Sequence, residues 1–200
     1  MVECPHDQPS WQTMRFRILP LYLVISCSGS MGKESLESVM QGIESLKETI
    51  LQDPMASETL WMSVIVAGSD AWQIDPLVPI DRFNIPFLFQ EGAGDLILGA
   101  AFKLVNSSIN RELVPKSIGC SGDFCPLIFV LVDHAPTDDW VDAATSLLNR
   151  TSPRIGSWLT MLTGTKARRE DYHYVPGMNL IELGNLQHDQ LKAFFRWIDQ

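Results

Sequence analysis

The chain has 200 residues, of which 46% are hydrophobic and 20% are charged. This balance is typical of a folded globular protein and excludes a disordered or fibrous one, and the length suits one α/β domain better than two. The formal net charge of −9 disfavours binding to nucleic acid phosphates or to an anionic membrane surface. We therefore expect neither a nucleic acid partner nor a membrane partner.

The N-terminal part of the chain bears on localisation and domain organisation. The longest apolar run, residues 18–25, is interrupted by a proline and is far shorter than the roughly 20 residues that a membrane-spanning helix needs. The N-terminus lacks the basic and apolar regions of a signal peptide, which predicts a cytoplasmic protein. Residues 1–14 show no hydrophobic periodicity, so we predict a flexible N-terminal arm followed by one domain over residues 15–200.

The first predicted elements are a strand and a helix. Residues 21–25 form a continuous apolar run, as a buried parallel strand does, and the Ser/Gly-rich segment 26–32 follows it. Apolar residues then recur at every third or fourth position over 36–50, which predicts an amphipathic helix that Pro54 closes.

The middle of the chain predicts a hairpin and a second helix. Residues 60–66 and 72–78 are rich in β-branched and aromatic residues with turn residues between them. A second amphipathic pattern covers 98–113 and stops at Pro115.

A second strongly apolar strand is predicted over 126–132, and the polar segment 133–139 follows it at once. Thr137 is a good N-cap for a helix over 140–147, and Asp138 would then lie at the positive end of that helix.

Residues 155–162 and 178–183 predict two further strands, and 191–198 predict a last helix with one apolar face. This order of elements specifies an open, mostly parallel sheet with helices on both faces, a Rossmann-like α/β fold. Ligands of such sheets bind at the carboxyl ends of the strands, so the loops 26–32 and 133–139 form the candidate site.

One enzymatic interpretation of the first loop stays open as a lesser alternative. Ser30 lies between small residues after a strand and before a helix, as the nucleophile of a serine hydrolase does. Asp133 and either His173 or His188 follow in the chain order of hydrolases. Against this interpretation, the loop follows the first strand of the sheet, and Ser28 replaces the usual first glycine.

Several stretches of the sequence resemble a known family. Residues 23–31, Leu-Val-Ile-Ser-Cys-Ser-Gly-Ser-Met, resemble the strand and loop of a von Willebrand factor A (vWA) domain, in which Asp-x-Ser-x-Ser follows an apolar strand. Residues 126–140 are similar to the vWA strand that ends in Thr-Asp-Gly. Three shorter stretches are similar to the tellurium-resistance TerY-like group of bacterial vWA proteins: 69–71, 98–101 and 194–197.

The resemblance implies a particular kind of site in the two loops. In vWA domains they build a metal-ion-dependent adhesion site, where hydroxyls and carboxylates hold a divalent cation that a partner's carboxylate completes. By position, the resemblance implies Ser28, Ser30 and Asp133 as the metal ligands of this chain.

Three residues depart from the family pattern: Ser26 replaces the first Asp, Leu96 replaces the Thr, and His134 replaces the Gly after the last Asp. Two neutral hydroxyls and one carboxylate are a poor ligand set for Mg²⁺, which needs six oxygens. We therefore expect a degenerate site with no cofactor, or with weakly bound Mg²⁺ or Mn²⁺. Without a metal, the buried Asp133 carboxylate needs other partners, and the serine hydroxyls of the first loop are the natural donors.

The leading hypothesis is a non-enzymatic protein interaction module. The resemblance implies work in a stress-response or defence assembly, with kinase, phosphatase or ATPase components as possible partners. The candidate partner-binding residues are Ser26, Ser30, Asp95, Asp133, His134, Asp138 and Trp140, the last as an exposed anchor.

A second hypothesis is a genuine Mg²⁺- or Mn²⁺-dependent receptor for an acidic partner residue. In this hypothesis Asp95 and Asp133 supply the carboxylate ligands, and Ser26 is a further possible ligand.

The mixed-charge stretch 166–171 is interpreted as a solvated loop.

Overall fold

The computed structural model describes residues 16–89, 94–172 and 175–184. The predicted N-terminal arm and the predicted helix over 191–198 lie outside these residues. Within the described part of the chain, no helix is both long enough and apolar enough to cross a bilayer.

Six strands form one sheet in the order β3-β2-β1-β4-β5-β6. The strands are β1 (Leu19–Ser26), β2 (Leu60–Ala67), β3 (Ala71–Pro79), β4 (Leu127–Val132), β5 (Ser157–Thr163) and β6 (Asn179–Gly184). All neighbouring strands are parallel except β3, which pairs antiparallel to β2 as the second strand of a hairpin. The mostly parallel sheet and the hairpin predicted from the sequence are therefore confirmed.

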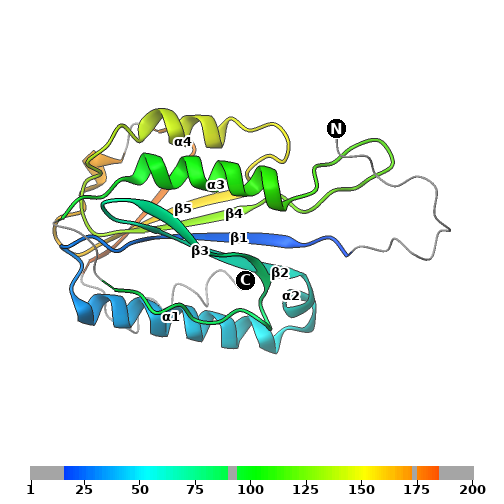
Figure 1. Ribbon diagram of the computed structural model, residues 1–200, viewed down its shortest axis with the longest axis horizontal. Helices are drawn as coiled ribbons and strands as arrows, with labels where there is room; N and C mark the ends of the chain where they lie inside the picture. The colour runs from blue at the N-terminus through cyan, green and yellow to red at the C-terminus, as the bar shows by residue number, and fades with distance from the viewer. Residues whose placement is uncertain (1–15, 90–93, 173–174, 185–200) are drawn as a thin grey trace.

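Helices cover both faces of the sheet, as predicted. The helices are α1 (Lys33–Gln52), α2 (Pro54–Thr59), α3 (Leu98–Glu112) and α4 (Val141–Leu148), together with the short 3-10 helix η1 (Arg169–Asp171). Figure 1 shows α3 and α4 on one face of the sheet and α1 and α2 on the other. The parallel connections thus place the ends of the central strands between the two helical layers.

The core consists of two apolar layers, one on each side of the sheet. On the α3 and α4 side, Tyr22 and Val24 of β1 pack in one cluster with Phe102. On the α1 side, Leu23 and Ile25 of the same strand belong to a second cluster. Both faces of β1 are buried, which explains its uninterrupted apolar run. Burial of each such large side chain contributes about 1.5–3 kcal/mol, so both layers hold the central strands firmly.

Pro54 both ends one helix and begins another. It follows α1, as predicted, but it also opens α2, which the sequence interpretation missed. Asp53 caps this short helix, since its Oδ1 accepts hydrogen bonds from the N–H groups of Met55 (2.8 Å) and Ala56 (3.2 Å). Proline is well tolerated at a first helical position because its missing N–H needs no partner there.

The predicted N-cap of α4 is wrong. The helix begins at Val141 and has no side-chain cap. Thr137 Oγ1 instead accepts a hydrogen bond of 3.2 Å from the N–H of Leu96. The Asp138 carboxylate caps α3, where it accepts hydrogen bonds from two N–H groups of the first turn, one of them that of Gly99 at 3.1 Å. Among the described residues, the start of α3 has no capping side chain of its own, so Asp138 from the loop after β4 supplies the cap.

Candidate functional site

The two candidate loops meet where the strand connections diverge. β1 and β4 are adjacent in the centre of the sheet. The chain leaves β1 for α1 on one face and leaves β4 for α4 on the other face (Figure 1). This topological switch point opens a crevice at the carboxyl ends of the two strands, and ligands of open α/β sheets bind in such crevices.

Asp133 lies directly after β4, is 9% exposed, and is surrounded by serine hydroxyls of the loop after β1. Ser26 Oγ donates a hydrogen bond of 2.6 Å to Oδ1 of Asp133, and Ser30 Oγ donates one to Oδ2. Ser28 Oγ makes longer contacts with the two carboxylate oxygens, at 3.4 and 3.3 Å. The expected hydrogen bonds from the serine hydroxyls to Asp133 are therefore present.

His134 adds a fourth donor to the same carboxylate. Its Nδ1 lies 3.0 Å from Oδ1 of Asp133 and 3.1 Å from Oγ of Ser30. A carboxylate can only accept, so Nδ1 carries the proton in this arrangement. Nε2 is buried without a hydrogen-bond partner among the described residues. The backbone carbonyl of His134 accepts a hydrogen bond from the hydroxyl of Tyr172, which fixes the start of this loop.

These contacts decide the ionisation of Asp133. Burial alone would raise the pKa of Asp133, but hydrogen bonds from Ser26, Ser30 and His134 outweigh burial and hold the pKa below its ordinary value of 3.8. The Asp133 carboxylate is therefore charged at neutral pH. Burial raises the pKa of Tyr172, and the negative charge of Asp133 raises it further, so this hydroxyl stays a donor.

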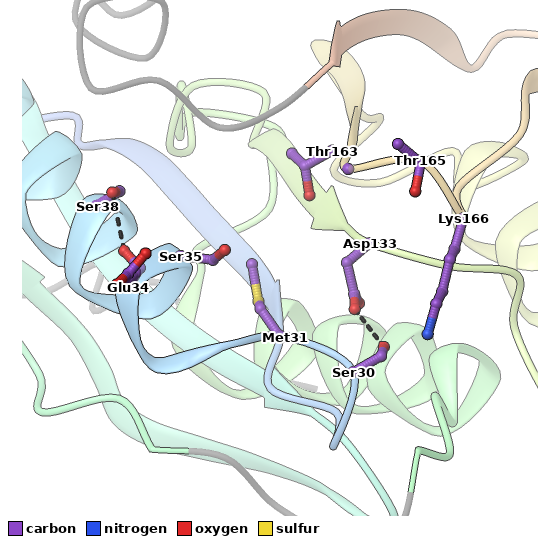
Figure 2. A pocket seen from close by; sticks show the side chains of 10 residues that line it. Ser30, Met31, Glu34, Ser35, Ser38, Asp133, Thr163, Thr165 and Lys166 are labelled. Carbon is purple, nitrogen blue, oxygen red and sulfur yellow. Dashed lines mark hydrogen bonds between the residues drawn. The ribbon is translucent and has the colours of Figure 1, made fainter.

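A pocket opens beside this network. It has a volume of about 360 Å³ and lies between the beginning of α1 and the loop that follows β5. Ser30 and Asp133 line it from the two site loops, Glu34 lines it from α1, and Lys166 lines it from the loop after β5 (Figure 2). Glu34 and Lys166 are not among the site residues predicted from the sequence. The signal that could have found Lys166 is the strand order, because parallel pairing of β5 with β4 brings the segment after β5 next to Asp133.

Three predicted site residues lie elsewhere. Asp95 is exposed and does not join Asp133 and His134, since no group of three or more acidic, His or Cys side chains that could hold a metal occurs among the described residues. Asp138 is occupied as the cap of α3. Trp140 is only 6% exposed, so the prediction of an exposed anchor is wrong.

Trp140 is buried because it closes the apolar layer under the site. Its ring packs edge-on against Phe102, with centroids 6.4 Å apart, and at a tilt against Tyr172, with centroids 5.6 Å apart. Aromatic pairs of this geometry stabilise a core beyond the area that they bury. The residue supports the site loops from beneath instead of contacting a partner.

The donor set around Asp133 fits Mg²⁺ poorly. Among the described residues, the hydrogen-bond network contains one carboxylate, that of Asp133, and both of its oxygens already accept hydrogen bonds from side chains of this chain. The residue at the position of the family's Thr is Leu96, which is fully buried and carries no ligand atom. Mg²⁺ gives up its water reluctantly and usually requires one or two free carboxylates, which these residues do not offer.

Among the described residues, His134 does not form the relay of a serine hydrolase. In a catalytic triad the imidazole contacts the serine with one ring nitrogen and the aspartate with the other. Here Nδ1 of His134 faces both Ser30 and Asp133, and the Ser30 hydroxyl donates directly to the aspartate. His173 and His188, the other candidate bases, lie outside the described residues.

Comparisons with known proteins rest on structure alone. No protein-family model matches the chain, and no curated protein matches its sequence. A von Willebrand factor type A protein from Catenulispora acidiphila is similar in structure, with a TM-score of 0.64 at 12% identity over 91% of this chain and 42% of that one. The ArnB paralog VWA2 from Sulfolobus acidocaldarius has a TM-score of 0.60 at 16% identity, over 89% of this chain and 44% of that one.

A third similar structure is proximal thread matrix protein 1 from the mussel byssus, with a zinc-occupied MIDAS motif, the metal-ion-dependent adhesion site. It has a TM-score of 0.59 at 11% identity, over 91% of this chain and 45% of that one. At these identities the likeness establishes the fold alone, and the chain has the fold of a vWA domain. The chain spans less than half the length of each of these three structures.

Proposed function

We propose that this chain is a non-enzymatic protein interaction module with a degenerate metal-ion-dependent adhesion site. Its docking surface is the carboxyl-end edge of the sheet, formed by the loops 26–32 and 133–139 and the pocket beside them. The observation that carries the proposal is the set of four donors on Asp133. The charge of this carboxylate is used to hold the two loops together, so it is not available to grip a cation or to activate a nucleophile.

The finer assignment follows the sequence resemblance. The stretches 69–71, 98–101 and 194–197 are similar to the TerY-like group, which supports a cytoplasmic role in a stress-response or defence assembly. Protein partners in general are supported by the structural neighbours, among which are a pilus adhesin from Lactobacillus rhamnosus GG and the mussel thread matrix protein. Kinase, phosphatase or ATPase components are the partners that the TerY-like resemblance implies.

Copurification with the full chain tests the docking surface. We expect Ser30→Ala and Asp133→Asn each to lose the partners that copurify with the unaltered chain. The matched control is Ile118→Ser, because Ile118 is 99% exposed. It belongs to the loop between α3 and β4, and this loop lies at the end of the sheet opposite to the site loops (Figure 1). Thermal unfolding of each purified variant separates loss of docking from loss of the fold. Unchanged partners in both site variants would contradict the proposed surface.

Two further experiments test whether partner binding needs a metal ion and whether Ser30 is a catalytic nucleophile. We expect partner binding to persist in EDTA, whereas a Mg²⁺- or Mn²⁺-dependent receptor would release its partner. We also expect no labelling of Ser30 by a fluorophosphonate probe, which reacts with activated serine nucleophiles. Labelling that Ser30→Ala abolishes would contradict a non-enzymatic module.

A further inference from the structure

Lys166 is the only cation among the described residues that line the pocket beside Asp133. Figure 2 shows its side chain running from the loop after β5 toward Ser30 and Asp133. Its ammonium makes no ion pair or hydrogen bond with any described residue. Lys33, at the start of α1, differs in this respect because its Nζ lies 3.6 Å from Glu37. The charge of Lys166 is therefore available to a ligand in the pocket.

Two hydroxyls of the pocket are also available as donors. The Ser38 hydroxyl already donates to the carbonyl of Glu34 (2.9 Å), and Thr163 Oγ1 donates to the carbonyl of Val132 (3.0 Å). The Ser35 and Thr165 hydroxyls line the same walls and make no hydrogen bond with the described residues. An ammonium with hydroxyl donors near it complements an acceptor-only group, and a carboxylate is such a group.

The acidic residues of the pocket limit the charge of the ligand. Asp133 is ionised but is covered by its own hydrogen-bond donors, and Glu34 is exposed at the edge of the pocket. A dianion such as a phosphate ester would be repelled by both carboxylates, whereas a single carboxylate can pair with Lys166 at a lower electrostatic cost. The polar lining, with Lys166 as the one unpaired cation among the described lining residues, thus favours a monoanionic ligand.

We propose that the pocket binds an aspartate or glutamate side chain of a protein partner, and that Lys166 supplies the positive charge that a metal ion would otherwise supply. This inference rests on the proposed docking function and names its partner chemistry. The partner's carboxylate accepts a charge-assisted hydrogen bond from the Lys166 ammonium, with the Ser35 and Thr165 hydroxyls as neutral donors. No metal ion takes part.

A titration with a minimal ligand tests this directly. The probe is N-acetyl-glutamate methylamide, which carries one side-chain carboxylate, added to the ¹⁵N-labelled full chain in EDTA while amide NMR shifts are followed. We expect saturable shifts in the segments 30–35 and 163–166, and none with the neutral glutamine analogue. Lys166→Ala should weaken binding about fivefold or more, and Lys166→Arg should retain most of it.

Two matched variants sharpen the test. Lys33→Ala removes a nearby lysine that already has a partner, and should leave the affinity within about twofold of the unaltered chain. Glu34→Gln removes a repulsive charge from the pocket wall and should strengthen binding. Equal affinity of Lys166→Ala and the unaltered chain, equal binding of the glutamine analogue, or a requirement for Mg²⁺ would each overturn the inference. Tighter binding of N-acetyl-phosphoserine methylamide would overturn the assignment to a carboxylate.

The outcome can be told apart from failure of the docking function itself. If Ser30→Ala loses the copurifying partners and Lys166→Ala keeps them, the docking surface stands and the role of Lys166 is wrong. If both variants keep all partners, both proposals are wrong.

Discussion

Two buried aspartates stand at opposite ends of the sheet, and the groups that bind them differ. Asp123, 8% exposed, lies before β4, and its carboxylate accepts hydrogen bonds from the backbone N–H groups of Ile18 (3.3 Å) and Val114 (2.8 Å). Asp133, 9% exposed, lies after β4 and is bound by three serine hydroxyls and an imidazole. The two carboxylates are equally buried, so burial alone does not distinguish their roles.

The difference in donors separates an aspartate that holds segments of the fold together, Asp123, from one that lies in the proposed docking surface, Asp133. Backbone N–H groups are fixed by the strands and loops that carry them, so Asp123 joins the segment before β1 to the loop before β4. Side-chain hydroxyls rotate and can exchange partners, so the loops around Asp133 can adjust when another molecule docks. We expect substitutions at the first aspartate to act on stability alone, and those at the second to act on binding as well as, to a smaller extent, on stability.

The largest effect is expected for Asp123→Ala. It removes the acceptor of a buried N–H group, that of Ile18, and of a partly buried one, that of Val114. Hydrogen bonds to a charged group contribute about 1.5–3 kcal/mol each, so we expect a loss of about 3 kcal/mol in the free energy of unfolding. Chemical denaturation measures this loss, and Asp81→Ala, at an exposed position, serves as the control. A loss below about 1 kcal/mol would mean that Asp123 is not a structural clamp.

Asp133→Asn is expected to cost less, about 1–2 kcal/mol at neutral pH, because the amide oxygen still accepts from the hydroxyls. The pKa of Asp133 lies below 3.8 in the folded chain, so ionised Asp133 stabilises the fold above this pH and the stabilisation is lost as the pH falls through the folded-state pKa. The difference in stability between the unaltered chain and Asp133→Asn should therefore be largest at neutral pH and vanish in acid. A difference that grows in acid would contradict the lowered pKa.

Ser26→Asp tests why the site does without a metal. Ser26 Oγ lies 2.6 Å from Oδ1 of Asp133, so a second carboxylate there would repel the first and destabilise the chain in EDTA. Millimolar Mg²⁺ should restore this loss, because two carboxylates with serine hydroxyls approach a Mg²⁺ ligand set. Thermal unfolding with and without Mg²⁺ measures the rescue, with Ser26→Asn as the neutral control. Equal responses of the two variants to Mg²⁺ would contradict the charge argument.

The central part of the site could be predicted from the sequence because it depends on periodicity and strand order. Continuous apolar runs place Ser26 and Asp133 at the ends of two strands, and parallel pairing of these strands brings their ends together. Once the two residues are adjacent, a buried carboxylate requires donors, and the serines of the same loop are the nearest ones. These steps need no contact between distant helices, so local patterns suffice.

The remainder depends on tertiary contacts that local patterns do not record. Trp140 was expected near the surface because it follows a polar loop, but the capping of α3 by Asp138 draws this segment inward and buries the ring. Lys166 lies in a mixed-charge stretch that resembles any solvated loop, and only the position of β5 beside β4 brings it to the pocket. Both cases show a side chain whose role is set by a neighbour more than 30 residues away in the sequence.

Calorimetry of the purified chain with Mg²⁺ and with Mn²⁺ tests the central claim most directly, namely that the surface around Asp133 works without a metal ion. We predict no heat of binding and no rise in the unfolding temperature at millimolar ion, because any ion bound to the folded state alone would stabilise it. A saturable heat with either ion that is lost in Asp133→Asn would contradict the account, as would a crystal structure with an ordered six-coordinate ion on the Asp133 carboxylate.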